Sequence, residues 1–162
     1  MFPDRKLMLI ATLSLFSTIP LAHGGQKIRF DGVQYTAGRF ETVELESGHT
    51  YSFVKEWRAI HAAEDLSSVT HLTRVECFGY IDARSDGSFS ADGYCNHWDR
   101  DGDHWVGHWW NSSQMSAGQF EVVSGSGKYT GASGGGTADC KFLNQGADPQ
   151  AACNISGMLE LQ

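Results

Sequence analysis

Short runs in which apolar and polar residues are interleaved recur along this chain of 162 residues. They are rich in β-branched and aromatic residues, and turn-forming residues separate them. The clearest runs are RFETVELESG, TYSFVKEW, TRVECFGYIDA and GMLELQ. The chain also has 19 glycines and only 3 prolines. This pattern predicts an all-β protein built from many short strands and tight turns.

The N-terminus has a different pattern. Arg5 and Lys6 precede an apolar run over residues 7–19, and a site of small residues follows at 22–24. This order is typical of a secretory signal peptide, and the run is shorter than the ~20 residues of a membrane helix. We therefore predict a signal peptide over residues 1–24 and a soluble, secreted or periplasmic mature chain. Residues 25–162 have the size of a single domain.

The charge narrows the range of partners. The whole chain has a formal net charge of −7, and the leader contributes one positive charge. The mature domain is therefore strongly acidic, which disfavours the phosphate backbone of nucleic acids and anionic membrane surfaces. We expect neither nucleic acid nor a membrane as a partner.

Four cysteines follow the leader, an even number in a chain bound for an oxidising compartment. Three connectivities are conceivable, and the turns discriminate among them. The sequence Ser-Asp-Gly at residues 85–87 lies midway between Cys77 and Cys95, and Cys140 and Cys153 flank a segment centred near Gly146. Folding each segment back on itself predicts two hairpin disulfides, Cys77 with Cys95 and Cys140 with Cys153.

Residues 95–110, CNHWDRDGDHWVGHWW, contain four of the five tryptophans and an Asp-Gly pair at 101–102 that favours a hairpin turn. A two-residue turn centred there fixes the register of the two flanking strands. The cross-strand pairs that it predicts are Trp98 with Trp105 and Tyr94 with Trp109.

The aspartates of this turn are a candidate metal site. Asp99, Asp101 and Asp103 alternate like the first ligands of a calcium loop. The helix–loop–helix calcium motif does not fit, because its sixth position is His104 instead of glycine and its twelfth is Trp110 instead of glutamate. Two hypotheses remain, an ordinary solvated turn and a weak calcium site.

The same register makes His97 and His108 diagonal neighbours on one face of the hairpin. Such a pair could bind a ligand or relay a proton, or both histidines could be hydrogen-bonded parts of a barrel wall. A second group of polar residues, in WRAIHAAEDLSSVTH, is predicted to lie in a loop that is either solvated or lines a barrel mouth. Its members are His61, Glu64, Asp65 and His71.

We predict two faces for these strands. The inner face contains Cys77, Cys95, His97, His104, Val106, His108 and Trp110. The opposite face contains Phe78, Tyr80, Tyr94, Trp98, Trp105 and Trp109. So much aromatic surface is unusual in contact with water. We expect it to be buried in a homo-oligomer, and the alternative is stacking on a ligand such as a sugar.

A glycine-rich segment, GSGKYTGASGGGT at residues 125–137, does not fit a phosphate-binding loop, because Val122 and Tyr129 replace required residues. It resembles a signature shared by barrels of the allene oxide cyclase and dirigent type, a calycin-like group. The order of features upstream of this segment is similar to that of small exported bacterial proteins assigned to that group. This order is a glycine-rich strand, Cys95, DRDGD and then an aromatic strand. The resemblance extends from about Tyr51 to the C-terminus. It implies a closed antiparallel eight-stranded β-barrel, often with a central cavity and often dimeric or trimeric.

These observations favour a secreted or periplasmic barrel that binds a small ligand without converting it. The cysteines are expected to be in disulfides, so none of them is expected to be a free nucleophile. The resemblance adds an alternative, a cyclase or isomerase acting on an apolar substrate in the barrel cavity. A third hypothesis is a structural protein that assembles through its tryptophan-rich face. The candidate ligand-binding residues are His97, His108, Tyr94, Trp98, Trp105 and Trp109.

Overall fold

The computed structural model describes residues 25–144 and 148–162. The predicted leader, residues 1–24, and the predicted turn at Gly146 lie outside the described residues. The strands are β1 (Gln26–Arg29), β2 (Gly32–Glu46), β3 (His49–Ala63), β4 (Thr73–Ala83), β5 (Phe89–Trp98), β6 (His104–Ser112), β7 (Gly118–Gly125), β8 (Ser133–Asn144) and β9 (Gln150–Leu161). A single 3₁₀ turn, η1 (Gly127–Tyr129), precedes β8. Within the described residues, no helix is long and apolar enough to cross a membrane.

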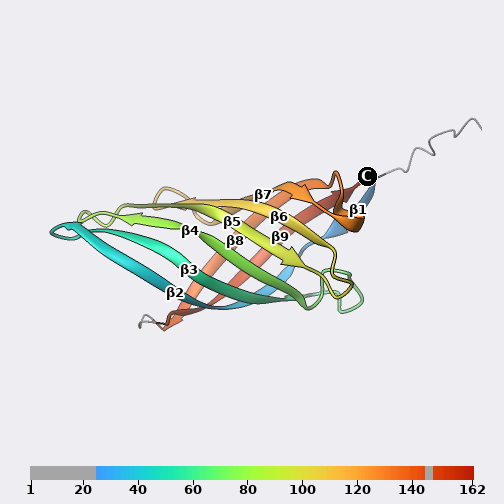
Figure 1. The fold of residues 1–162 in the computed structure, drawn as a ribbon, viewed down its shortest axis with the longest axis horizontal. Coiled ribbons are helices and arrows are strands. Elements are labelled where there is room, and N and C mark those ends of the chain that lie inside the picture. The colour runs from blue at the N-terminus through green and yellow to red at the C-terminus, as the bar shows by residue number, and fades with distance from the viewer. Residues whose placement is uncertain (1–24, 145–147) are drawn as a thin grey trace, which may run out of the picture.

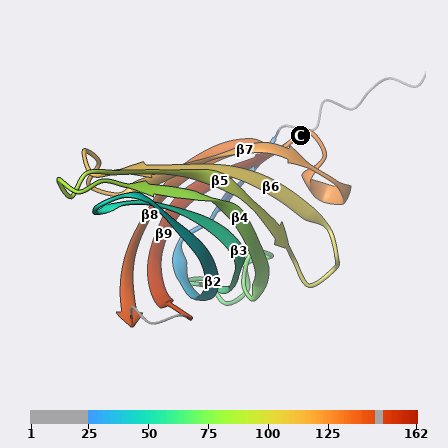
Figure 2. The ribbon, with the colours of Figure 1, turned by 60° about the vertical axis from the view of Figure 1, so that its left-hand side comes forward.

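Strands β2 to β9 form a closed antiparallel barrel (Figures 1 and 2). Each strand pairs with the next along the chain, and β9 pairs with both β8 and β2, which closes the ring. Strand β1 pairs with the C-terminal part of β9 and so continues the line of β2. The prediction of an all-β, eight-stranded antiparallel barrel is confirmed.

Both predicted disulfides are confirmed, Cys77–Cys95 between β4 and β5 and Cys140–Cys153 between β8 and β9. In each case the two cysteines are direct cross-strand partners. The turn between β4 and β5 has Gly87 at φ 82°, and it produces the register that places Cys77 opposite Cys95. Two formed disulfides fit an oxidising compartment.

The turn between β5 and β6 differs from the prediction by one residue. The Asp99 N–H donates to the Asp103 carbonyl (3.0 Å), so the loop consists of residues 100–102 instead of two residues. Gly102 has φ 87°, the left-handed conformation that completes a three-residue hairpin turn. The pairs are therefore His97 with Trp105 and Trp98 with His104.

A shift of one residue moves every side chain of a strand to the other face. On β6 the inward residues are Trp105, Gly107 and Trp109, whereas the predicted inner residues His104, Val106, His108 and Trp110 face outward. Trp105 is only 1% exposed. The prediction that Trp105 and Trp109 belong to an outer aromatic face was wrong. The prediction that His97 and His108 are neighbours on one face was also wrong, because they lie on opposite sides of the barrel wall.

Two ends of the barrel can be distinguished in Figure 1. The turns that join β2 to β3 and β4 to β5 lie at one end, which we call the open end. The turn that joins β5 to β6 and the loop of residues 64–72 lie at the other, which we call the closed end. Thr70 of that loop is 1% exposed, so part of the loop is packed into the closed end.

Candidate ligand site in the barrel

The closed end of the barrel interior is filled by aromatic and imidazole rings. Phe30, between β1 and β2, stacks on His61 of β3 with 4.0 Å between ring centroids. Phe30 also makes edge-to-face contacts with His97 and Trp105, with 5.5 Å and 5.2 Å between ring centroids. The rings of His97 and Trp105 stack in parallel, with 3.7 Å between their centroids. All four side chains are at most 5% exposed. This cluster forms a closed floor of the barrel.

The two imidazoles of the floor are neutral near pH 7. Burial, and to a smaller extent nearby His71, lowers the pKa of His61 to about 4, although Asp31 opposes this shift. Burial lowers the pKa of His97 well below its usual value, and His61 adds to this effect. Among the described residues, Nδ1 of both histidines and Nε2 of His61 have no hydrogen-bond partner. The floor therefore contains unused polar atoms without a formal charge.

Towards the open end, inward-facing side chains keep contact with solvent. Trp57 of β3 lies 6.4 Å from Phe142 of β8 and 5.5 Å from Phe40 of β2, measured between ring centroids. Since β2 and β9 separate β3 from β8 in the sheet, the contact between Trp57 and Phe142 spans the interior. Phe142 is 51% exposed and Trp57 is partly exposed. Solvent therefore reaches these inward-facing rings.

Trp109 of β6 lies on the inner face of the wall, against Gly93 of β5 and Gly79 of β4. A Cβ atom at Gly79 or Gly93 would be within 2.8 Å of its ring, so the indole lies close against a wall that only glycine permits. Its Nε1 atom is buried and has no hydrogen-bond partner among the described residues. An indole N–H is a hydrogen-bond donor only, and buried donors normally have partners. Trp109 thus provides a free donor inside the barrel.

The other candidate ligand residues lie on the outer wall. Tyr94 is 40% exposed and stacks on Phe78 with 5.8 Å between ring centroids. The Arg74 guanidinium lies over the ring of Trp98, 4.5 Å from its centroid. The His108 imidazole lies between two carboxylates, with Nε2 2.9 Å from Asp92 and Nδ1 3.5 Å from Glu121. The six predicted residues therefore divide into an inner set, His97, Trp105 and Trp109, and an outer set, Tyr94, Trp98 and His108.

The three aspartates of the calcium hypothesis are brought together, but around an ammonium group. Lys128 Nζ lies 2.9 Å from a carboxylate oxygen of Asp99, 2.5 Å from Asp101 and 3.9 Å from Asp103. Among the described residues, no group of three or more His, Cys, Asp or Glu side chains is arranged to hold a metal ion. The geometry favours an ion-pair network, in which the lysine takes the place of a bound cation.

This network gives the glycine-rich segment a structural role. Lys128 and Tyr129 belong to η1, and Tyr129 is 1% exposed in the core. Burial and the carboxylate of Asp99 raise the pKa of Tyr129, which keeps its hydroxyl protonated. Gly127 has φ 59°, and a Cβ there would collide with Asp103. The segment therefore holds η1 against the turn between β5 and β6.

Comparison with solved structures identifies the architecture. The chain superposes on the pterocarpan synthase dirigent protein GePTS1 with a TM-score of 0.53 and 13% identity, over 83% of this chain and 92% of that one. It superposes on the pterocarpan synthase dirigent protein PsPTS1 with a TM-score of 0.52 and 11% identity, over 83% of this chain and 94% of that one. The fold is that of a dirigent-type barrel. No protein-family model and no curated protein matches the sequence.

The inner site of this dirigent-type barrel includes residues that sequence reasoning missed. Trp57, Ala59, His61 and Ala63 alternate along β3, and the last three are buried. The prediction that His61 lies in a loop was wrong, whereas Glu64, Asp65 and His71 do lie in the loop of residues 64–72. The period-two pattern WRAIHAA was the signal that could have placed Trp57 and His61 inside.

Proposed function

We propose that the protein is an exported dirigent-type barrel that binds a small ligand in its interior and releases it unchanged. The ligand enters from the open end, where its apolar part lies against Trp57 and Phe142. A polar atom of the ligand accepts a hydrogen bond from Trp109. The leader-like pattern of residues 1–24 and the two disulfides support a secreted or periplasmic location.

The observation that carries this proposal is the buried, unused N–H of Trp109. Leaving a buried donor without a partner costs about 1–3 kcal/mol, which a ligand acceptor would recover on binding. The inward rings of Trp57 and Phe142 would remove apolar ligand surface from water, as the linings of most small-molecule sites do. Binding without turnover is favoured because the inward cysteines are all in disulfides and offer no free thiol nucleophile.

A cyclase or isomerase is the second candidate, and the floor histidines favour it. His61 and His97 are neutral and have free nitrogen atoms, so each could accept a proton from a substrate that reached the floor. Both imidazoles are at most 5% exposed, so their nitrogen atoms are not accessible from solvent. A binding role therefore requires no rearrangement of the floor, whereas catalysis by these histidines does.

Native mass spectrometry of the protein purified from its own source tests the proposal. We expect a mass increment of one small organic molecule for each chain, which disappears on denaturation. The same preparation of Trp109→Phe, which keeps the aromatic ring and removes the donor, should retain less of the molecule. Trp98→Phe on the outer wall is the matched control and should retain as much as the parent. Parent protein without any bound molecule, and without binding to a panel of apolar ligands, contradicts the proposal.

Assembly into a homo-oligomer is a separate proposal, supported by the outer wall. Phe53, Phe78 and Tyr94 are each at least 40% exposed and lie on neighbouring strands β3, β4 and β5. Burial of these rings against a second copy would gain about 25 cal/mol for each Å² removed from water. Light scattering should give a mass above that of one chain, and Phe78→Ser with Tyr94→Ser should lower it. If the parent protein is monomeric, this assembly is excluded, and the proposal for the inner site is not affected.

A further inference from the structure

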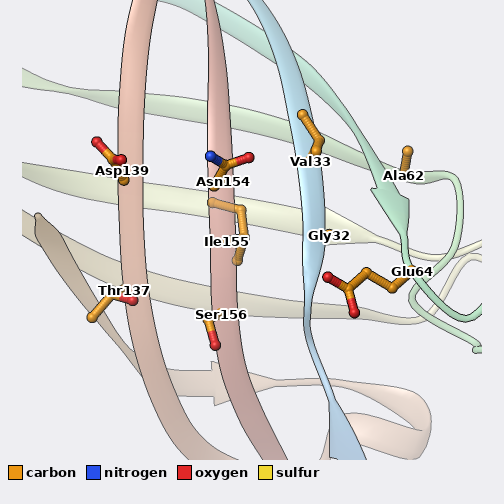
Figure 3. Close-up of a pocket in the computed structure, with 9 residues that line it drawn as sticks. All are labelled: Gly32, Val33, Ala62, Glu64, Thr137, Asp139, Asn154, Ile155 and Ser156. Atoms are coloured by element: carbon orange, nitrogen blue, oxygen red, sulfur yellow. The ribbon is translucent and has the colours of Figure 1, made fainter.

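A groove of about 520 Å³ crosses the outer wall of the barrel where β3, β2, β9 and β8 lie side by side (Figure 3). Its floor is small and apolar, with Val33 of β2 and Ala62 at the end of β3. This groove lies outside the barrel and does not include the walls around Trp109. It is therefore separate from the residues of the proposed inner site.

Polar side chains are concentrated along the β8 and β9 side of the groove. Asp139 and Asn154 are cross-strand partners, and Thr137 and Ser156 form the adjacent pair on the same face. Figure 3 shows these four side chains on the two neighbouring strands. A carboxylate, an amide and two hydroxyl groups thus occupy two rows about 7 Å apart. Such a set can donate to and accept from several hydroxyl groups of one ligand.

The groove also has unneutralised negative charge. Glu64 extends from the end of β3 towards β2 (Figure 3), and Asp139 lies on β8, at the other side of the groove. Within the described residues, neither carboxylate forms an ion pair, and both side chains are exposed. The chain as a whole has a net charge of −7. These charges favour a ligand that carries positive charge and disfavour an anionic one.

An exposed aromatic ring lies beside the groove. Tyr35 is two residues beyond Val33 on β2, hence on the same face of the sheet, and it is 60% exposed. Its cross-strand partners are Ile60 on β3 and Ala152 on β9. A flat, exposed tyrosine can stack on the apolar face of a sugar ring, and it attracts a nearby cation.

We propose that this outer groove binds a glycan that carries free amino groups, such as a run of glucosamine units. The ammonium groups bind Glu64 and Asp139, the hydroxyl groups bind Asn154, Thr137 and Ser156, and Tyr35 stacks on one sugar ring. The proposal does not depend on the inner site, because the groove and the barrel interior lie on opposite faces of the same strands.

Isothermal titration calorimetry with defined oligosaccharides tests the proposal. Glucosamine tetramers, tested at about pH 6 where their amines are protonated, should bind, and added salt should weaken the binding. Fully N-acetylated tetramers of the same length should bind more weakly. Asp139→Asn and Tyr35→Ala should each weaken binding by about fivefold or more. Glu44→Gln and Tyr94→Ala, which change an exposed carboxylate and an exposed ring outside the groove, should leave it unchanged.

Three results would overturn this assignment. One is the absence of binding by glucosamine tetramers at millimolar concentration. Another is equal binding of the acetylated and the free-amine tetramers, which would remove the role of the carboxylates. The third is equal loss of affinity in the groove variants and in their controls, which would indicate adsorption to an acidic surface. None of these results bears on ligand binding in the barrel interior, which the Trp109 variant tests separately.

Discussion

The ammonium group of Lys128 lies 2.9 Å from the carboxylate of Asp99, whose side chain is only 1% exposed. Asp99 Oδ1 also accepts hydrogen bonds from the backbone N–H groups of Asp101 (2.9 Å) and Asp103 (3.2 Å). One carboxylate therefore organises the turn between β5 and β6 and anchors η1 to it. Lys128 supplies the positive charge that makes burial of this carboxylate tolerable.

We predict that Lys128→Met destabilises the protein by about 2–4 kcal/mol, because it leaves the buried Asp99 carboxylate without a counter-charge. Urea denaturation measures the change. Lys27→Met is the matched control, since Lys27 pairs with Glu160 at 2.9 Å but both side chains are largely exposed. The ion pair between Lys27 and Glu160 should contribute less than about 1 kcal/mol to the free energy of unfolding. Similar losses in the two variants would mean that the Asp99 ion pair has no special role.

We predict that calcium leaves the melting temperature of the parent protein unchanged. The Lys128 ammonium occupies the space between Asp99, Asp101 and Asp103, and a divalent cation there would have to displace it. In Lys128→Met the three carboxylates are free, so millimolar calcium should raise the melting temperature of that variant. A calcium-dependent rise in the parent that is lost in Asp101→Asn would restore the calcium hypothesis.

Stability should fall as the pH is lowered from 6.5 towards 4. His61 has a folded-state pKa of about 4, and that of His97 is well below its usual value of 6.5. Between these values the unfolded chain binds more protons than the folded one, so acidification favours unfolding. The loss is roughly 1.4 kcal/mol for each unit of pKa difference. Urea denaturation at pH 7.5, 6 and 5 measures it, and constant stability over this range would show that the floor histidines are not buried neutral groups.

The barrel and its disulfides were predictable because local signals coincide. Strand-forming runs alternate with turn residues, and the glycine at position 87 fixes the register that joins Cys77 to Cys95. The family resemblance at residues 125–137 supplied the closed, eight-stranded form, which periodicity alone does not give. Closure depends on the pairing of β2 with β9, two segments more than a hundred residues apart.

The candidate site was predicted less well, for a reason that lies in one turn. An Asp-Gly pair is compatible with a two-residue turn and with a three-residue turn that has glycine in the left-handed position. Gly102 adopts the second form, and this choice moved Trp105 and Trp109 from the outer wall to the interior. The role of Lys128 was equally hidden, because its contact with Asp99 joins residues 29 positions apart through the folded barrel.

The central claim is that the barrel interior, not its outer wall, holds the ligand, and the indole N–H signal of Trp109 tests it most directly. In nitrogen-15 NMR spectra each of the five tryptophans gives one such signal, which single Trp→Phe variants assign. During titration with a ligand recovered from the native protein, we predict that the Trp109 signal shifts as its N–H gains an acceptor. The signal of Trp98, on the outer wall under Arg74, should stay in place. A shift of Trp98 with an unchanged Trp109 would contradict the account.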